Sequence, residues 1–201
     1  MTVRSWISEK IKGVLIKKEG KNAKVKIDKA DPGDVYEIAN VFYRTWLNTY
    51  PNEEYGILVD DIEDRFQNAF SQEKLNKRAE AIANSPDTQM MLVARAGDQV
   101  VGLIDVKKDL EKNELRAMYV LPEYQGLGLG KALWSKAKKH FDKDKDTVLS
   151  VALYNKAAIN FYKKIGFQET YEISYPEGFK MKSGAVIPVT KMIMRKNSRW
   201  Y

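Results

Sequence analysis

The sequence predicts an α/β protein built on a mixed sheet, from the order in which helical and strand patterns follow one another. Apolar residues at helical spacing dominate residues 35–84, short strand-like runs separated by turns follow, and the final third alternates strand and helix. Consecutive strands joined by tight turns pair antiparallel, whereas strands joined through a helix can pair parallel. With 201 residues, 44% of them hydrophobic, the chain can form one substantial core.

The helical stretches come first. A turn at 31–34 leads into a helix whose apolar residues recur at helical spacing from Val35 to Trp46. Two more helices are expected at 58–70 and 72–84. Ahead of these helices, the extreme N-terminal residues 1–12 fit a short amphipathic helix, and residues 14–18 and 24–28 fit the two strands of a hairpin.

Strand patterns follow from residue 89 onward. A meander is expected first, because Gly97-Asp98 separates two such runs and Pro122 ends a third. The run at 147–153 is almost continuously apolar, which is typical of a strand buried on both faces. The expected strands are 89–95, 100–107, 114–121, 147–153, 167–174 and 186–194, and the helices expected between them are 128–141 and 155–165.

Positive charge is concentrated at the N-terminus. The net charge is +7, and residues 1–30 hold nine Lys or Arg against three Asp or Glu, a balance of +6 that leaves +1 for the rest of the chain. A nucleic-acid groove usually spreads cations over the folded face, so we expect no nucleic-acid partner. We expect a basic N-terminal extension over residues 1–24 and one folded domain over residues 25–201.

Two absences narrow the chemistry. The chain has no cysteine and one histidine, His140, so thiolate nucleophiles and disulfides are excluded and no metal is expected. Polar neighbours, Lys138, Lys139 and Asp142, indicate that His140 is a solvated helix residue. No apolar run reaches the length of about 20 residues that a membrane helix needs, and no secretory signal is visible, so a cytoplasmic protein without membrane contact is expected.

The strongest chemical signal lies at 115–133, where a strand ends at a proline, three alternating glycines form a loop and a helix begins. Glycines let a backbone approach a ligand closely, and amides at a helix N-terminus favour negative charge, so this loop suits a phosphate. A P-loop is excluded, because Gln125 stands where its first glycine belongs and Ala132 where its Ser or Thr belongs. A dinucleotide fingerprint fails because Lys131 and Leu133 occupy the positions of its last glycine.

This loop resembles the pyrophosphate loop of the GNAT acetyltransferase superfamily. The matching residues are Gln125-Gly126-Leu127-Gly128-Leu129-Gly130, preceded by Met118-Tyr119-Val120-Leu121-Pro122. The stretch 151–167 is similar to the family's next strand and helix, with its Asn, its A-x-x-F/Y-Y pattern and its closing Gly-Phe. The resemblance covers about residues 25–195. It implies a mixed, mostly antiparallel sheet with one splayed parallel strand pair, flanking helices, and acetyl-CoA as co-substrate.

The resemblance also implies roles for individual residues. Backbone groups of Met118, Tyr119 and Val120 would meet the pantetheine arm and the acetyl carbonyl. The amides that would hold the pyrophosphate belong to Gln125, Gly126, Leu127, Gly128, Leu129, Gly130 and Lys131. Asn155 would bind the pantetheine chain or cap its own helix, and Tyr162 would protonate the departing thiolate or serve as a core aromatic.

The general base has several candidates. An alkylammonium group has a pKa of about 10, so the amine must lose a proton before it attacks the thioester. Glu114 occupies a strand position used as the base in part of the family, and the alternatives are a solvated role for Glu114, a water chain, or Asp105. Because the chain has no cysteine, we expect direct attack in a ternary complex.

The acceptor is expected to be a small primary amine, with polyamines favoured, because the stretch 119–125 looks like the branch of the superfamily that includes polyamine acetyltransferases. Trp46 and Tyr50 are expected to bind it, since they fall in the helical region that covers the acceptor side in this family. Acidic residues at 53–64 either attract a cation or form the wet face of a helix. The alternatives are a protein or peptide N-acetyltransferase and a non-catalytic acetyl-CoA-binding regulator, and a homodimer is compatible with the sequence.

Overall fold

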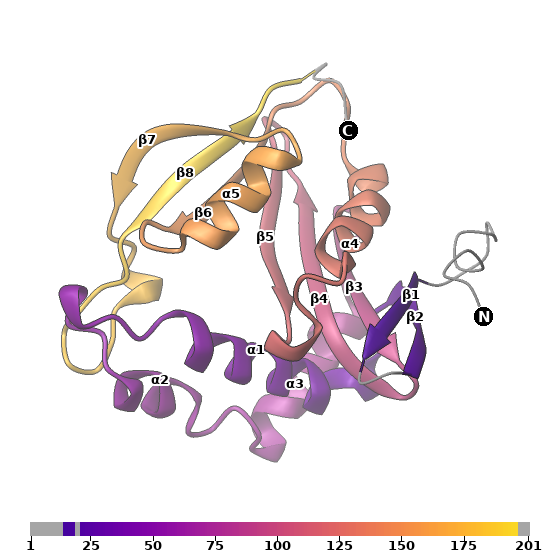
Figure 1. Ribbon diagram of the computed structural model, residues 1–201, viewed down its shortest axis with the longest axis horizontal. Coiled ribbons are helices and arrows are strands. Elements are labelled where there is room, and N and C mark those ends of the chain that lie inside the picture. Colours follow the sequence, from indigo (N-terminus) through magenta and orange to yellow (C-terminus); the bar gives the residue numbers. More distant parts are fainter. Residues whose placement is uncertain (1–13, 19–20, 197–201) are drawn as a thin grey trace.

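The computed structural model describes residues 14–18 and 21–196 and has one mixed sheet flanked by helices (Figure 1). The eight strands of that sheet lie in the order β1-β2-β3-β4-β5-β6-β8-β7. Their bounds are β1 (Val14–Lys18), β2 (Lys21–Lys29), β3 (Gln89–Ala96), β4 (Gln99–Lys108), β5 (Asn113–Val120), β6 (Thr147–Ala152), β7 (Gln168–Ser174) and β8 (Val189–Met194). The α-helices are α1 (Val35–Thr49), α2 (Val59–Phe66), α3 (Gln72–Ala83), α4 (Leu129–Ala137) and α5 (Lys156–Lys164).

The mixed, mostly antiparallel sheet expected from the sequence is confirmed, because β5 and β6 pair parallel and every other described pair is antiparallel. Most element ends also agree to within a few residues. The clearest differences are at two helix ends: α2 ends at Phe66 rather than at Phe70, and α4 ends at Ala137 rather than at Phe141, with a 3-10 turn over Lys138–His140. Residues 67–70 form a turn, and Ser71 then caps α3 by accepting a hydrogen bond from the Lys74 amide (3.4 Å).

Helices α1 and α4 cover opposite faces of the sheet. The Phe42 ring of α1 meets the Tyr119 ring edge-on at 5.1 Å, so α1 lies on the face toward which Tyr119 points. A Cβ atom at Gly102 would lie 3.3 Å from Val120 and 3.5 Å from Leu133 of α4, so α4 lies on the Val120 face. Successive strand residues point to opposite faces, and the sheet therefore separates the two helices.

Strands β5 and β6 separate soon after they begin. Their parallel pairing covers only Asn113 with Thr147 and Glu114 with Val148. In the β4–β5 register, Leu115 pairs with Val106 and Ala117 with Asp105, which leaves Arg116 as the extra residue of a β-bulge. A bulge bends its strand and increases its twist, so β5 turns away from β6 at Arg116. The gap that opens there is the splayed pair implied by the family resemblance.

The core has two parts. The main cluster packs α1 and α4 against the central strands, with Trp134 among its fully buried side chains. A smaller cluster joins Trp46 of α1 and its C-cap residue Tyr50 to Ile62 of α2 and to Met181 in the β7–β8 loop. This second cluster fixes the helical region on the Tyr119 side of the splayed strands.

The N-terminal expectations are tested only in part. The hairpin is confirmed, since β1 and β2 pair antiparallel and β2 continues the sheet onto β3. The helix expected at 1–12 lies outside the described residues, and the boundary after residue 24 stays a prediction.

His140 is half-buried rather than solvated, and its Nε2 has no hydrogen-bond partner among the described residues. Among those residues, no helix has the length and hydropathy needed to cross a bilayer.

Asp34 and Arg95 join the start of α1 to β3 through two hydrogen bonds of 2.6 Å. Burial alone would raise the pKa of Asp34, but the bonds from Arg95 and from the Asp31 amide outweigh it and hold that pKa below its ordinary value. We expect Asp34→Asn to lower the free energy of unfolding by about 2–3 kcal/mol at pH 7, since Arg95 loses its partner in a largely buried place.

The pH dependence of this loss has a defined sign. The pKa of Asp34 is lower in the folded protein than in the unfolded chain, where it is about 3.9. The stability that Asp34 contributes is therefore fully present above the unfolded pKa, and it is lost as the pH falls through the folded pKa. Urea unfolding should therefore show a difference between wild type and variant that shrinks in acid. Glu73→Gln, which breaks the exposed pair with Lys77, is the control and should change stability by less than about 0.5 kcal/mol. An equal loss in the two variants would contradict the role of Asp34.

Candidate active site

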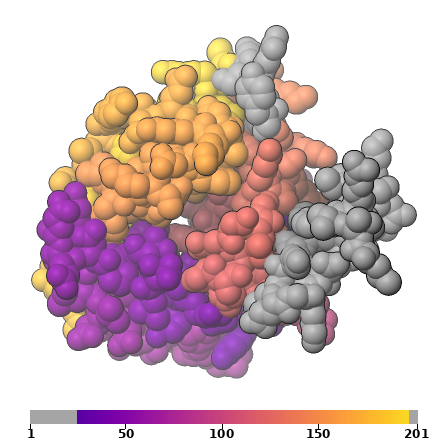
Figure 2. Space-filling view, in the orientation of Figure 1, coloured from indigo at the N-terminus to yellow at the C-terminus, as the bar shows by residue number. Residues whose placement is uncertain are grey.

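A cleft with a volume of about 750 Å³ occupies the gap between the splayed strands. Figure 2 shows the molecule hollowed where α1, the loop before α4 and α5 approach one another. Of the residues expected from the sequence, those that line the cleft are Tyr50, Met118, Tyr119, Val120, Gln125, Gly126, Gly128, Leu129, Gly130, Lys131, Asn155 and Tyr162. Three others, Trp46, Glu114 and Leu127, do not line it.

The glycine loop presents its backbone to this cleft. Gly126 and Gly128 have φ angles of 75° and 84°, in the left-handed region that favours glycine, and a Cβ atom at either position would meet nothing within 4 Å. Gly128 is the N-cap of α4, so the first amides of that helix face the same space. The Gln125 side chain closes the loop by donating to the Val120 carbonyl (2.9 Å). Leu127 instead packs against the main core.

The edge of β5 offers amides to the cleft. The Leu121 amide donates to the Val101 carbonyl of β4 (2.9 Å), and Val120 lies opposite Gly102. Because successive N–H groups of a strand alternate between its two edges, the amides of Met118 and Val120 face away from β4. They therefore point into the gap beside β6, where a bound carbonyl oxygen can accept a hydrogen bond.

Helix α5 supplies two further lining residues. Asn155 caps the helix, because its Oδ1 accepts a hydrogen bond from the Ala158 amide (3.0 Å), and its Nδ2 remains a donor for a ligand. Tyr162 is 8% exposed and packs its ring against Phe161 and Phe167. Burial, together with the nearby Tyr119, raises the pKa of Tyr162 far above its ordinary value, so its hydroxyl stays protonated. Tyr162 therefore belongs to the hydrophobic core and also lines the cleft.

Aromatic hydroxyls connect α1 to both splayed strands. The Tyr119 oxygen lies 3.2 Å from Trp46 Nε1 and 3.2 Å from the Tyr50 oxygen. The Tyr154 hydroxyl, after β6, donates to the Tyr50 carbonyl (2.8 Å). Tyr154 lines the cleft, and its role was missed in the sequence, although it directly precedes Asn155 in the second motif.

Trp46 takes a different place from the one expected. It is 6% exposed and packs between the Tyr50 ring (4.4 Å between centroids) and the Phe179 ring (5.8 Å), with the Arg65 guanidinium 4.7 Å above it. It therefore supports Tyr50 and Tyr119 from behind and does not line the cleft. The α1 residues that do line it beside Tyr50 are Thr45, Asn48 and Thr49, which share one helix face and carried no family motif.

The two candidate carboxylate bases lie outside the lining. Glu114 sits where β5 and β6 are still paired, opposite Val148. Asp105 is 5% exposed on β4, and burial raises its pKa although Arg116 (3.5 Å) and Gln89 act in the opposite direction. Neither side chain reaches the cleft surface.

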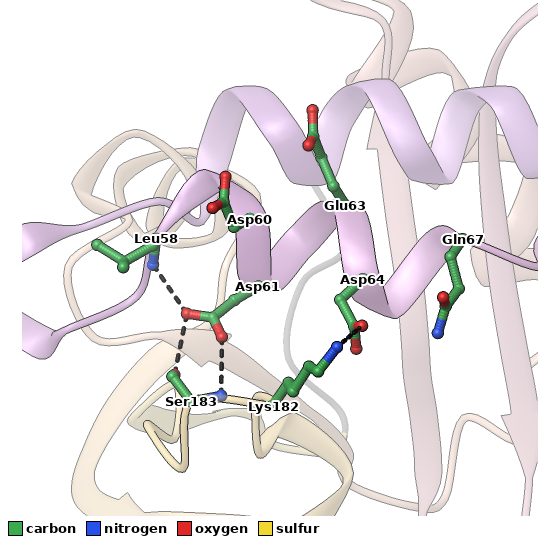
Figure 3. A pocket seen from close by; sticks show the side chains of 8 residues that line it. All are labelled: Leu58, Asp60, Asp61, Glu63, Asp64, Gln67, Lys182 and Ser183. Atoms are coloured by element: carbon green, nitrogen blue, oxygen red, sulfur yellow. Dashed lines mark hydrogen bonds and ion pairs between the residues drawn. The ribbon is translucent and has the colours of Figure 1, made fainter.

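The acidic stretch forms a separate depression of about 560 Å³ on α2 and the β7–β8 loop (Figure 3). Asp61 is buried there and accepts hydrogen bonds from the Leu58 amide and from the amide and hydroxyl of Ser183. Asp64 pairs with Lys182 at 2.7 Å. These two acids fasten α2 to the β7–β8 loop, and no acidic residue of the stretch lines the cleft.

Comparison with known proteins agrees with this geometry. The acetyltransferase (GNAT) domain family matches residues 47–183. The spermidine N(1)-acetyltransferase of Thermoplasma acidophilum is 30% identical over 151 residues, which are 72% of this chain and 88% of that protein. The crystal structure of PaiA N-acetyltransferase from Thermoplasma acidophilum in complex with coenzyme A is 26% identical, with a TM-score of 0.61 over 85% of this chain and 98% of that one.

The fold is shared more widely. The ribosomal-protein-S18-alanine N-acetyltransferase of Escherichia coli is 17% identical and superposes with a TM-score of 0.58 over 88% of this chain and 99% of its own. The family match and the relatives named N-acetyltransferases identify an acyltransferase of the N-acetyltransferase type. The chain belongs to the GNAT acetyltransferase family.

Proposed function

We propose that this protein transfers the acetyl group of acetyl-CoA to a small primary amine, by direct attack in a ternary complex. The observation that carries the proposal is the cleft itself, in which the glycine loop, the outward amides of β5 and Tyr162 line one continuous space. Spermidine is the first acceptor to test, because a relative with 30% identity bears that name.

The cleft offers groups suited to successive parts of coenzyme A. The amides from Gln125 to Lys131 hold the pyrophosphate, where two glycines leave open space and the N-terminus of α4 favours negative charge. Asn155 Nδ2 donates to the pantetheine chain. Acetyl-CoA would supply the activated acetyl group, and residues of β5 together with Tyr162 would hold its thioester.

Two groups then act on the reacting atoms. The Val120 amide donates to the acetyl oxygen and stabilises the negative charge that develops there during attack. The Tyr162 hydroxyl donates its proton to the departing sulfur, for which its protonated state is required. Tyr50 and Tyr154 border the end of the cleft nearest α1, where the amine enters.

The acceptor preference can be measured directly as kcat/KM for spermidine, free amino acids and N-terminal peptides. We expect spermidine to exceed the peptides, because the supporting relative carries a polyamine name. A peptide preferred by more than about tenfold, equal to about 1.4 kcal/mol of transition-state discrimination, would contradict the small-amine assignment. Binding of acetyl-CoA without coenzyme A release for any amine would favour a regulatory protein instead.

A further inference from the structure

The charge of the cleft lining is one-sided. The charged side chains that line it are the cations Arg116, Lys131 and Lys156, and no Asp or Glu among the described residues does so. Glu123, in the loop that precedes the glycines, is engaged by Arg44 at 3.0 Å. Lys131 and Lys156 suit the phosphates of coenzyme A, but an ammonium group that enters this cleft meets no counter-charge. Transferring an unpaired charge out of water is costly, so this lining disfavours the charged form of the amino group that reacts.

The acceptor end offers neutral hydroxyls in place of a carboxylate. Besides the Ser and Thr residues, the lining contains five tyrosine hydroxyls. They belong to Tyr50 at the C-cap of α1, Tyr119 of β5, Tyr124 just before the glycine loop, Tyr154 between β6 and α5, and Tyr162 of α5. Burial raises the pKa of Tyr50 and of Tyr119, and it raises the pKa of Tyr154 to about 12. Tyr50, Tyr119 and Tyr154 are therefore uncharged at neutral pH.

The hydrogen bonds already made by Tyr50 and Tyr119 determine which donors and acceptors the pair can still offer to a ligand. The indole of Trp46 is only a donor, so the Tyr119 oxygen accepts its bond. One phenol of the pair donates to the other, which uses one of their two protons. The pair retains one proton and lone pairs for a ligand, and Arg65, whose positive charge acts on both phenols, makes this spot unfavourable for a second cation.

We propose that the acceptor amine binds in its neutral form, donating an N–H to the Tyr50–Tyr119 hydroxyl pair and keeping its lone pair for the acetyl carbon. This inference rests on the proposed function and specifies which protonation state of the amine that function uses. It differs from a mechanism in which Glu114 or Asp105 removes a proton from a bound ammonium.

The proton balance closes without a carboxylate. The amine nitrogen forms a bond to the acetyl carbon, the carbon–sulfur bond breaks, and its electron pair goes to sulfur. The nitrogen loses one proton and the sulfur gains one, so a neutral amine and a thioester give an amide and a thiol with no proton left over. Tyr162 can give its hydroxyl proton to sulfur and receive the proton from nitrogen. Solution equilibrium, rather than an enzymatic base, then supplies the reactive amine.

The pH dependence of kcat/KM tests this. An alkylamine and its analogues fluorinated on the β-carbon differ little in size, and each added fluorine lowers the pKa of the conjugate acid. We expect kcat/KM to rise tenfold per pH unit up to a limit that moves with the pKa of each amine. If kcat/KM levels off at the same pH for all amines, the inference is overturned. It is also overturned if Glu114→Gln shifts the pH at which kcat/KM levels off. If no amine is acetylated although acetyl-CoA binds, the proposed function fails and the inference falls with it.

A tyrosine substitution tests the binding partner. Tyr50→Phe keeps the ring against Trp46 and removes one hydroxyl of the pair. We expect KM for the amine to rise about tenfold, equal to about 1.4 kcal/mol, with the Kd for acetyl-CoA unchanged. The control is Tyr43→Phe on the same helix, because Tyr43 packs against Phe66 and lies outside the cleft lining. Equal KM values in the two variants would show that the hydroxyl pair does not bind the amine.

Discussion

Replacing Gly128 by valine is expected to abolish measurable binding of acetyl-CoA, a loss of at least about a hundredfold or 2.7 kcal/mol. Gly128 has a φ of 84°, and its missing side chain leaves open the space above the first amides of α4. A valine side chain would fill that space, and a β-branched residue also resists this backbone angle. Calorimetric titration with acetyl-CoA measures the loss.

The control must separate two effects of Gly128→Val: backbone strain at a positive φ angle, and loss of the space that the ligand occupies. Gly97 has a φ of 61° in the β3–β4 turn and, like Gly128, would place a Cβ atom in open surroundings. Gly97→Val therefore carries a similar backbone penalty outside the cleft lining, and we expect it to bind acetyl-CoA as the wild type does. Circular dichroism should show both variants folded. Unchanged affinity in Gly128→Val would remove the glycine loop from the cofactor site.

Local signals in the sequence account for most of the fold. The helix from Val35 and the strands from residue 89 were predictable because periodicity and turn residues act over a few neighbours. The bulge at Arg116 was not, since it depends on the register between β4 and β5 and has no mark of its own. The splay of β5 from β6 was accessible only through resemblance to a family.

The site was predictable to the extent that its residues are contiguous. The loop 125–131 and the pair Asn155 and Tyr162 belong to two short motifs, and all but Leu127 line the cleft. Trp46 was expected to bind the acceptor because it falls in the helical region that covers the acceptor side in the family, but that resemblance does not tell that its ring packs behind Tyr50. The acidic stretch had two open interpretations, and the contact of Asp61 with Ser183, distant in sequence, could not be read from composition.

Tyr162→Phe is expected to lower kcat by roughly a hundredfold, the usual cost of losing a positioned proton donor. The substitution removes one oxygen and keeps the ring contacts with Phe161 and Phe167, so the fold and the packing of α5 should persist. The pyrophosphate loop is untouched, and the Kd for acetyl-CoA should stay within about twofold. Steady-state kinetics with a saturating amine, together with calorimetry, measure the two quantities separately.

Comparing the effect of Tyr162→Phe on kcat with its effect on acetyl-CoA binding distinguishes a catalytic role of Tyr162 from a packing role. A hydroxyl that acts on the departing sulfur contributes only in the transition state, so its loss lowers kcat and kcat/KM by the same factor. A tyrosine that only packs would keep its ring contacts with Phe161 and Phe167 as phenylalanine, so its replacement would leave kcat nearly unchanged. If turnover stays within a factor of two of wild type, Tyr162 is a core residue, and the sulfur must take its proton from solvent.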